Sequence, residues 1–221
     1  MTIGHKSTTI RIGLDDTDHP ESGCTTETLD KLLRLLTSTF DLTIQERRLV
    51  RLWPFAERRT RGNGALGALI ASNESAVEPI IEKCREWFNE LAEQVSHFPD
   101  SEFPTSPCLV ISLRETPEEW YWSSVRGHVD FSERLEAAIE SGCEVFCSGT
   151  NWGIVGASAA VSWLPNSHSS WELVAWRDDS NIGKNRQVCY DSVSQLESLF
   201  PDTFLNRDPT KAKGLIAPRT P

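Results

Sequence analysis

The sequence predicts an α+β protein, because strand patterns and helix patterns alternate irregularly along its 221 residues. Residues 8–14 form a strand-like run that turns apolar and ends at an acidic cluster. Residues 26–39 and 74–95 repeat apolar side chains at helical spacing. The opening order of strand, helix, strand, strand, helix and strand is that of a ferredoxin-like unit.

The first half of the chain contains five expected elements. These are a strand over 8–14, a helix over 26–39, strands over 42–53 and 65–72, and a helix over 74–95. Thr25 or Thr26 is the expected N-cap of the first helix, and Glu27 in its first turn favours the helix dipole.

The second half follows a segment, residues 96–107, that carries three prolines and is the best linker candidate. It divides the chain into an expected module over 1–104 and a second α+β module over 105–221. The elements expected after it are strands over 108–113 and 144–147, helices over 117–127, 130–142 and 152–164, a strand over 171–177, a short element over 187–190, a helix near 191–200, and a final segment over 214–219.

The composition indicates a soluble globular protein, with 38% hydrophobic and 24% charged residues. No apolar run approaches the roughly 20 residues of a membrane helix, and the N-terminus lacks a secretory signal pattern. Six cysteines are too few for a disulfide framework in a chain of this length. We therefore expect a cytoplasmic, reducing compartment and free thiols, including Cys143 and Cys147, which have no second close pair to complete a zinc site.

The charge balance is acidic, with 22 basic against 32 acidic residues and a net charge of -10. Such a surface repels phosphate backbones on average, although local basic patches can persist. A free-standing, non-specific nucleic-acid binder is therefore a poor first interpretation.

Three carboxylates, Asp15, Asp16 and Asp18, directly follow the first strand. Neighbouring carboxylates repel one another unless a cation lies between them. Hard oxygen ligands suit Mg²⁺, which usually binds together with substrate phosphates. A solvated acidic turn is the alternative, and the position after a buried strand gives the two interpretations equal weight.

A basic, glycine-containing loop runs from Arg58 to Gly64. Guanidinium groups and bare backbone N–H groups can both bind phosphate oxygens. The alternative is a hairpin turned by Asn63-Gly64, a favoured turn dipeptide. Six arginines between residues 47 and 61 are the strongest local anomaly in this acidic chain.

The third motif is glycine-rich and spans residues 149–157, where it opens an expected helix. A helix N-terminus attracts anions, but the motif matches neither a P-loop nor a dinucleotide fingerprint. Small residues that let a helix pack closely on a sheet are the simpler interpretation. Thr25, which follows Gly23 and Cys24, has two open roles: helix cap or acceptor of a phosphoryl group.

Taken together, these segments resemble a known family. The blocks 12–26, 47–66, 153–164, 171–177 and 214–221 are similar, in this order, to the N-terminal half of archaeal tRNA-Ile agmatidine synthetase, also called tRNA agmatinylcytidine synthetase. That family couples ATP cleavage to attachment of agmatine at the wobble cytidine of an isoleucine tRNA. The resemblance implies a kinase-like domain with a ferredoxin-like domain, and the OB-fold and zinc ribbon that follow in the family are expected to be absent here.

The resemblance also implies roles for individual residues. It assigns metal and phosphate handling to Asp15, Asp16 and Asp18, and phosphorylation to Thr25. It assigns ATP and phosphate binding to a larger set: Arg59, Thr60, Arg61, Gly62, Asn63, Gly64, Gly153 and Gly156. This sequence departs from the family pattern at Trp152, where arginine is usual, and at Ser158, where leucine is common.

The resulting expectation is an ATP- and Mg²⁺-dependent ligase or phosphotransfer enzyme that activates a wobble cytidine or related nucleotide for attack by agmatine or another amine. Two alternatives stay open: a stand-alone ATP-dependent kinase for a small molecule, and a non-catalytic nucleotide-binding subunit. We expect tRNA to bind this chain only weakly without further domains, because few of its phosphates could be neutralised.

Overall fold

The computed structural model describes residues 7–19, 23–59, 62–99 and 101–162, together with Gln195 and Ser198. The chain divides into two compact units, residues 1–167 and 168–221. All strands and helices described below belong to the first unit. Of the elements expected beyond residue 167, the strand over 171–177, the short element over 187–190 and the segment over 214–219 lie outside the described residues, and only Gln195 and Ser198 of the helix near 191–200 are described, both as helical.

The described residues of the first unit form five strands and five α-helices. In chain order they are β1 (Ser7–Asp15), α1 (Thr25–Thr39), β2 (Leu42–Arg51), β3 (Gly64–Asn73), a short 3₁₀ turn (Glu74–Ala76), α2 (Val77–Ser96), β4 (Cys108–Ser112), α3 (Glu119–Arg126), α4 (Phe131–Glu140), β5 (Glu144–Cys147) and α5 (Ile154–Val161).

The five strands form one sheet in the order β2-β3-β1-β4-β5, and every neighbouring pair is antiparallel. The predicted α+β class is therefore confirmed, as is the ferredoxin-like order of the first six elements. The connection through α1 passes over β3, and the connection through α2 passes over β1. Because β4 pairs with β1, the sheet is continuous across residue 104, and the segment before β4 connects helix α2 to a strand of the same sheet.

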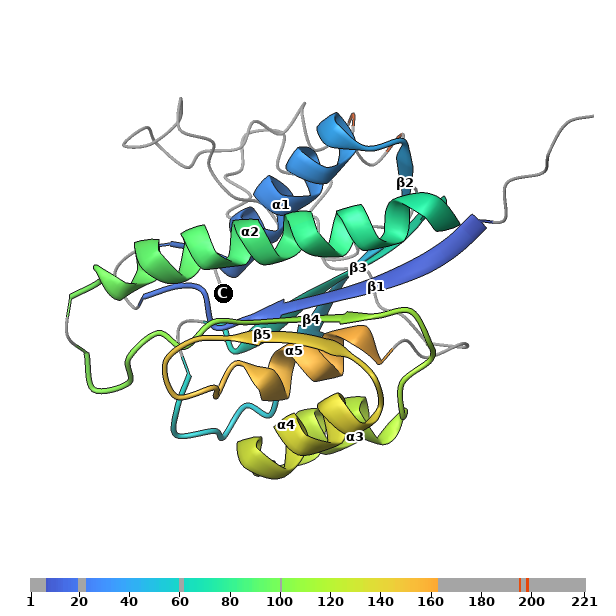
Figure 1. Cartoon of the computed structure of the whole chain (residues 1–221). Coiled ribbons are helices and arrows are strands. Elements are labelled where there is room, and N and C mark those ends of the chain that lie inside the picture. The colour runs from blue at the N-terminus through green and yellow to red at the C-terminus, as the bar shows by residue number, and fades with distance from the viewer. Residues whose placement is uncertain are drawn as a thin grey trace, which may run out of the picture. The chain divides into compact units, whose positions relative to one another are not determined.

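Helices α1 and α2 cover one face of the sheet (Figure 1). Alternate residues of β1 point to this face, because successive side chains of a strand point to opposite sides. Ile10, Ile12 and Leu14 are fully buried against the leucine stripe of α1 and the apolar stripe of α2. Burial of each such side chain contributes about 1.5–3 kcal/mol, so this layer is the main core.

Helix α5 lies against the opposite face, and α3 and α4 pack beyond it (Figure 1). The backbone of α5 approaches the sheet closely at two glycines of the strands. A Cβ on Gly13 would lie 2.1 Å from the carbonyl oxygen of Ala157, and a Cβ on Gly67 would lie 2.6 Å from that of Ala160. The interpretation of residues 152–164 as a small-residue helix that packs closely on a sheet is confirmed.

Buried Arg134 of α4 connects the three helices of this face. Its guanidinium donates to the carbonyl oxygen of Trp120 at 3.1 Å, to Oγ of Ser158 at 3.0 Å and to Oγ of Ser123 at 2.8 Å. Burial lowers the pKa of Arg134 to about 10. The hydroxyl of Ser158 therefore accepts a hydrogen bond from a buried cation. Ser158 is a position at which this sequence departs from the family pattern.

The ends of two expected elements differ from the prediction. The N-cap of α1 is Cys24, and its side chain makes no capping hydrogen bond. The expectation that Thr25 or Thr26 caps the helix was therefore wrong, because both residues already have helical positions. Strands β2 and β3 do form a hairpin, but a loop of residues 52–63 connects them, and Gly64 already pairs with Arg51.

Cys108 and Cys147 form a disulfide, so the expectation of a free thiol at Cys147 was wrong. The two residues lie opposite each other in the register of β4 and β5, with Cα atoms 4.2 Å apart. Their sequence separation of 39 gives no sign of this contact. Within the described residues Cys24, Cys84 and Cys143 are free, as expected for Cys143.

None of the helices in the described part of the chain is long and apolar enough to cross a membrane.

Candidate functional site

Asp15, the last residue of β1, lies directly beside the first turn of α5. A Cβ on Gly156 would lie 2.0 Å from Oδ2 of Asp15, so only glycine allows the carboxylate to occupy this place. Burial raises the pKa of Asp15 well above its ordinary value, and the neighbouring charge of Asp16 raises this pKa further. Asp15 is therefore a desolvated carboxyl group, whose ionised form a nearby positive charge would stabilise.

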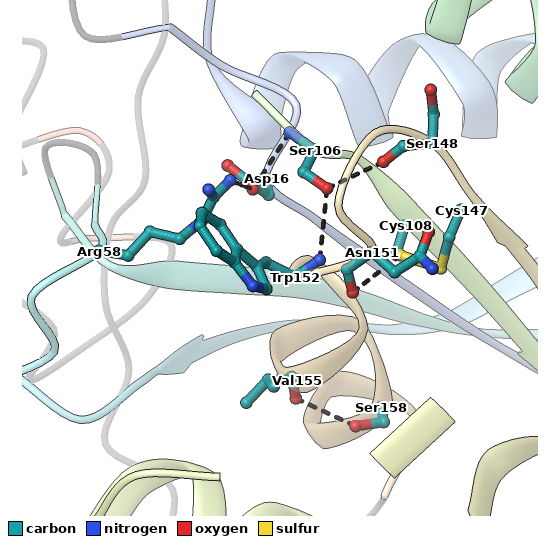
Figure 2. The surroundings of a disulfide bond; sticks show 10 residues. All are labelled: Asp16, Arg58, Ser106, Cys108, Cys147, Ser148, Asn151, Trp152, Val155 and Ser158. Atoms are coloured by element: carbon teal, nitrogen blue, oxygen red, sulfur yellow. Dashed lines mark hydrogen bonds and ion pairs between the residues drawn. A yellow bond between two sulfur atoms is a disulfide. The ribbon is translucent and has the colours of Figure 1, made fainter. Parts of the chain in front are cut away.

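Asp16 turns the chain away from the sheet with a φ of 57°, in the left-handed region. Its Oδ2 forms an ion pair with Arg58 and accepts a 3.2 Å hydrogen bond from the backbone N–H of Ser106. Burial raises the pKa of Asp16, and the guanidinium of Arg58 acts against this rise. The structure thus brings the acidic loop and the basic loop together, as Figure 2 shows.

Asp18 faces a different element, the start of α1. Its Oδ1 accepts a 3.3 Å hydrogen bond from the hydroxyl of Thr25. Both side chains are buried, with 8% and 6% of their surfaces exposed. Gly23, two residues before Thr25, has a φ of 80° and lies close to Asp18. The hydroxyl of Thr25 therefore contacts a carboxylate of the acidic cluster.

The three carboxylates do not converge on one point. Within the described ranges, no three residues among His, Cys, Asp and Glu are grouped closely enough to hold a metal ion. Mg²⁺ often needs only one or two protein carboxylates, since waters and substrate phosphates complete its shell. Asp15 and Asp16 are desolvated, and buried Thr17 has a hydroxyl without a hydrogen-bond partner in the described chain. These oxygens fit a cation that arrives with a nucleotide.

The described residues of the basic loop have separate contacts. Arg58 lies at the acidic loop, whereas Arg59 is exposed and donates to the carbonyl oxygen of Pro54. Asn63 has a φ of 42° and donates from Nδ2 to the carbonyl oxygen of Trp53 at 2.6 Å. The carbonyl oxygen of Gly62 accepts from Arg51 at 3.1 Å. Thr60 and Arg61 lie outside the described residues.

The arginines that precede this loop are divided between the two faces of the sheet. Arg47 donates to Asp30 of α1 at 2.6 Å, while Arg48 donates to the carbonyl oxygen of Ser162 at 2.8 Å on the opposite face. The run of arginines in the sequence is therefore not one continuous patch, because neighbouring residues of a strand alternate between faces.

The glycine-rich loop is tied to the acidic loop through Ser106, which sequence reasoning missed. Ser106 donates from its backbone to Asp16 and from Oγ to the carbonyl oxygen of Ser148 at 2.8 Å. Its Oγ accepts from the backbone N–H of Trp152 at 3.3 Å (Figure 2). Its carbonyl oxygen accepts from the backbone N–H of Gly153 at 3.2 Å. A lone serine in a proline-containing segment gives no sequence signal for this role.

Comparisons with known proteins identify the family of this chain. The family model of the TiaS TCKD domain matches residues 11–150, and that of the TiaS FLD domain matches residues 151–221. Proteins named as the isoleucine-tRNA 2-agmatinylcytidine synthetase TiaS are similar over most of the chain. The one from Cenarchaeum symbiosum is 33% identical over 97% of this chain, and the one from Pyrococcus horikoshii is 34% identical over 95%. These matches cover 46% and 48% of the two relatives, so the chain spans about half their length.

Two solved structures share the fold. A structure described as a tRNA fluorescent labeling enzyme has a TM-score of 0.73 at 23% identity, over 96% of this chain and 49% of that one. The structure of apo TiaS, an isoleucine-tRNA agmatidine synthetase, has a TM-score of 0.68 at 24% identity, over 92% of this chain and 47% of that one. At these identities the likeness concerns the fold alone. Because the two family models together cover residues 11–221 in order, the chain belongs to the TiaS family.

Proposed function

We propose that this chain carries the ATP-dependent part of an agmatinylcytidine synthetase. It activates the wobble cytidine of a tRNA, or a related nucleotide, for attack by agmatine or another amine. The similarity to isoleucine-tRNA 2-agmatinylcytidine synthetases over 97% and 95% of the chain supports this proposal. A related complex is described as TiaS with its isoleucine tRNA, AMPCPP and agmatine.

The contact between Asp18 and Thr25 is the observation that carries the proposal. Oγ1 of Thr25 donates to the Asp18 carboxylate at the end of a buried strand, where the carboxylate can accept the hydroxyl proton. The hydroxyl oxygen forms a bond to the terminal phosphorus of ATP, the phosphoanhydride bond breaks, and ADP leaves. Thr25 then holds the phosphoryl group, which divides one transfer into two steps.

Mg²⁺ is the proposed metal, and Asp15, Asp16 and Asp18 are its candidate ligands, of which one or two would bind the ion while waters and substrate phosphates complete its shell. When bound, the ion neutralises phosphate charge during transfer. Asp15 and Asp16 are disposed to receive it, because burial raises the pKa of each and a cation would relieve this desolvation.

The proposed phosphate-binding groups come from the two loops that flank the carboxylates. From the basic loop they are Arg59, Thr60, Arg61, Gly62, Asn63 and Gly64; from the start of α5 they are Gly153 and Gly156. The N–H groups in the first turn of a helix favour anions. Gly153 and Gly156 leave no room for a Cβ, which brings the backbone of this turn close to Asp15.

An ATP turnover assay tests the proposal. The full chain is incubated with Mg²⁺ and ATP, with and without agmatine and tRNA, and the products AMP and ADP are resolved. Mass spectrometry should place added phosphate on Thr25. Thr25→Val should abolish this label and turnover, while Thr26→Val, one position later, should keep both. Full activity of Thr25→Val would limit this residue to a structural role.

A small-molecule kinase is the second candidate, and the net charge of -10 favours it. Such a surface disfavours a polyanionic acceptor, and Arg47 and Arg48 are engaged on opposite faces. We propose that residues 1–221 alone bind tRNA at roughly 10⁻⁵ M or weaker at physiological salt, near the non-specific range. A filter-binding titration distinguishes the candidates, because sub-micromolar and sequence-selective binding would favour tRNA as the acceptor.

A further inference from the structure

Arg58 is the residue through which the basic loop contacts the acidic loop. Its Nη2 contacts Oδ2 of Asp16 and donates to the carbonyl oxygen of Pro104 at 2.6 Å. Its Cζ lies 3.7 Å from the centroid of the Trp152 ring. Figure 2 shows the guanidinium between the carboxylate and the indole. Three separate segments of the chain therefore fix one cation.

The other terminal nitrogen of Arg58 has no such partner. Nη1 is buried and makes no hydrogen bond within the described part of the chain. A buried donor without an acceptor is costly, so native proteins usually satisfy such groups with protein, water or ligand. A guanidinium offers two parallel donors to a phosphate group. Nη1 thus supplies a donor next to Asp16. The Asp16 side chain is itself half-buried, with 16% of its surface exposed.

Trp152 provides a fixed surface beneath this guanidinium. Its ring packs edge-on against Phe131, with centroids 6.0 Å apart, and its backbone N–H donates to Ser106. A cation within about 6 Å of the ring centroid is attracted to an indole face, and the guanidinium of Arg58 lies well inside this distance. The guanidinium can therefore shift between acceptors while it stays on the same aromatic surface.

One carboxylate cannot fully neutralise two cations, so Arg58 and a metal ion would compete for Asp16. In the structure its carboxylate is paired with Arg58. A divalent cation at the same carboxylate would be repelled by the guanidinium at short range. Binding of a cation to Asp16 therefore favours movement of Arg58 toward another anion, and the nearest anion in a nucleotide complex is a phosphate group.

We propose that Arg58 is a phosphate-binding residue that neutralises Asp16 until a divalent cation and a nucleoside triphosphate bind, and that it then exchanges this carboxylate for a phosphate oxygen while stacked on Trp152. The proposal rests on the proposed function, because it assumes that the nucleotide binds at these loops. It assigns to Arg58 a role that differs from that of exposed Arg59.

Calorimetry on the full chain with two probes, Mg²⁺ alone and Mg²⁺-ATP, tests the proposal. In Arg58→Gln the competing cation is lost, so Mg²⁺ alone should bind several-fold more tightly. The same variant lacks a charge-assisted phosphate contact, so Mg²⁺-ATP should bind about 10- to 100-fold more weakly. Opposite changes for the two probes are the expected result.

Arg126→Gln is the matched control, because Arg126 also stacks on a tryptophan, Trp122, at 4.1 Å but lies on α3. It should leave both affinities unchanged. Arg58→Lys keeps the charge but not the two parallel donors, so it should keep the wild-type affinity for Mg²⁺ alone and lose affinity for Mg²⁺-ATP. If thermal unfolding shows that Arg58→Gln is not folded, Arg58→Lys alone tests the phosphate contact.

Changes of the same sign for both probes, or none for either, would overturn the proposal and leave Arg58 a structural residue. If the wild-type chain binds Mg²⁺-ATP and only the Arg58 result fails, the proposed function stands. If the wild-type chain does not bind Mg²⁺-ATP, both proposals fail.

Discussion

Gly156 of α5 lies against the Asp15 carboxylate so closely that a Cβ at this glycine would stand 2.0 Å from Oδ2. The start of a helix and the end of a strand are thereby fixed relative to each other. The contact joins the first sequence motif to the third, which are far apart in the chain.

Gly156→Ala should destabilise the protein by about 1–3 kcal/mol, the usual cost of overpacking. The added methyl group must displace either the carboxylate of Asp15 or α5. Urea unfolding measures the effect, and Gly127→Ala is the control, since a Cβ at Gly127 meets nothing within 4 Å. In the Asp15→Ala background the cost of Gly156→Ala should be clearly smaller. Equal costs in both backgrounds would contradict the contact.

Asp15→Asn should stabilise the ligand-free protein at neutral pH, on the order of 1–3 kcal/mol, the scale of an uncompensated buried polar group. The folded pKa of Asp15 is raised by burial and by Asp16, so the folded state binds its proton more tightly than the unfolded state. The stability that this proton contributes is present below the ordinary pKa of 3.8 and is lost as pH rises through the folded pKa.

The gain from Asp15→Asn should therefore grow with pH across that window and become constant above it. Thermal unfolding from acidic to neutral pH measures this dependence, and exposed Asp41→Asn is the control. A gain that does not change with pH would show that the carboxyl does not titrate as expected. The variant should also lose binding of Mg²⁺-ATP, because the stabilising change removes a candidate ligand.

Ser106→Ala should weaken Mg²⁺-ATP binding and lower stability by about 1–3 kcal/mol. It removes the acceptor of the Trp152 N–H and the donor to the carbonyl oxygen of Ser148, which leaves two half-buried backbone groups without these partners. Ser101→Ala in the same segment removes only a local hydrogen bond to Phe103 and serves as the control. Equal effects of the two substitutions on nucleotide affinity would exclude Ser106 as the connection between the loops.

The Cys108–Cys147 disulfide should protect these two residues from alkylation under denaturing conditions without reductant, while Cys24, Cys84 and Cys143 react. Peptide mass spectrometry identifies the modified residues. Reduction should then lower the free energy of unfolding by about 2–4 kcal/mol, because the bond restricts the unfolded chain. Alkylation of Cys108 and Cys147 before reduction would show that the bond is not formed.

The sequence alone determined the elements and the location of the three motifs. Apolar spacing predicted β1, α1 and α2 to within a few residues, since local periodicity records which face each element buries. The small residues of 153–161 predicted a closely packed helix. In the structure this helix packs against Gly13 and Gly67 of the sheet. The acidic cluster was placed at the end of a buried strand, and Thr25 was singled out as a helix cap or an acceptor of a phosphoryl group.

Only the tertiary structure decided which residues of these motifs meet. The resemblance assigned phosphate binding to Arg59, and the fold brings the neighbouring Arg58 to Asp16 and Trp152. Sequence reasoning gave no sign of Ser106, and it treated Cys147 as a free thiol although the β4–β5 register pairs it with Cys108. Local periodicity specifies an element and its buried face, but contacts between distant residues depend on strand order and register, which are set by the packing of the whole sheet.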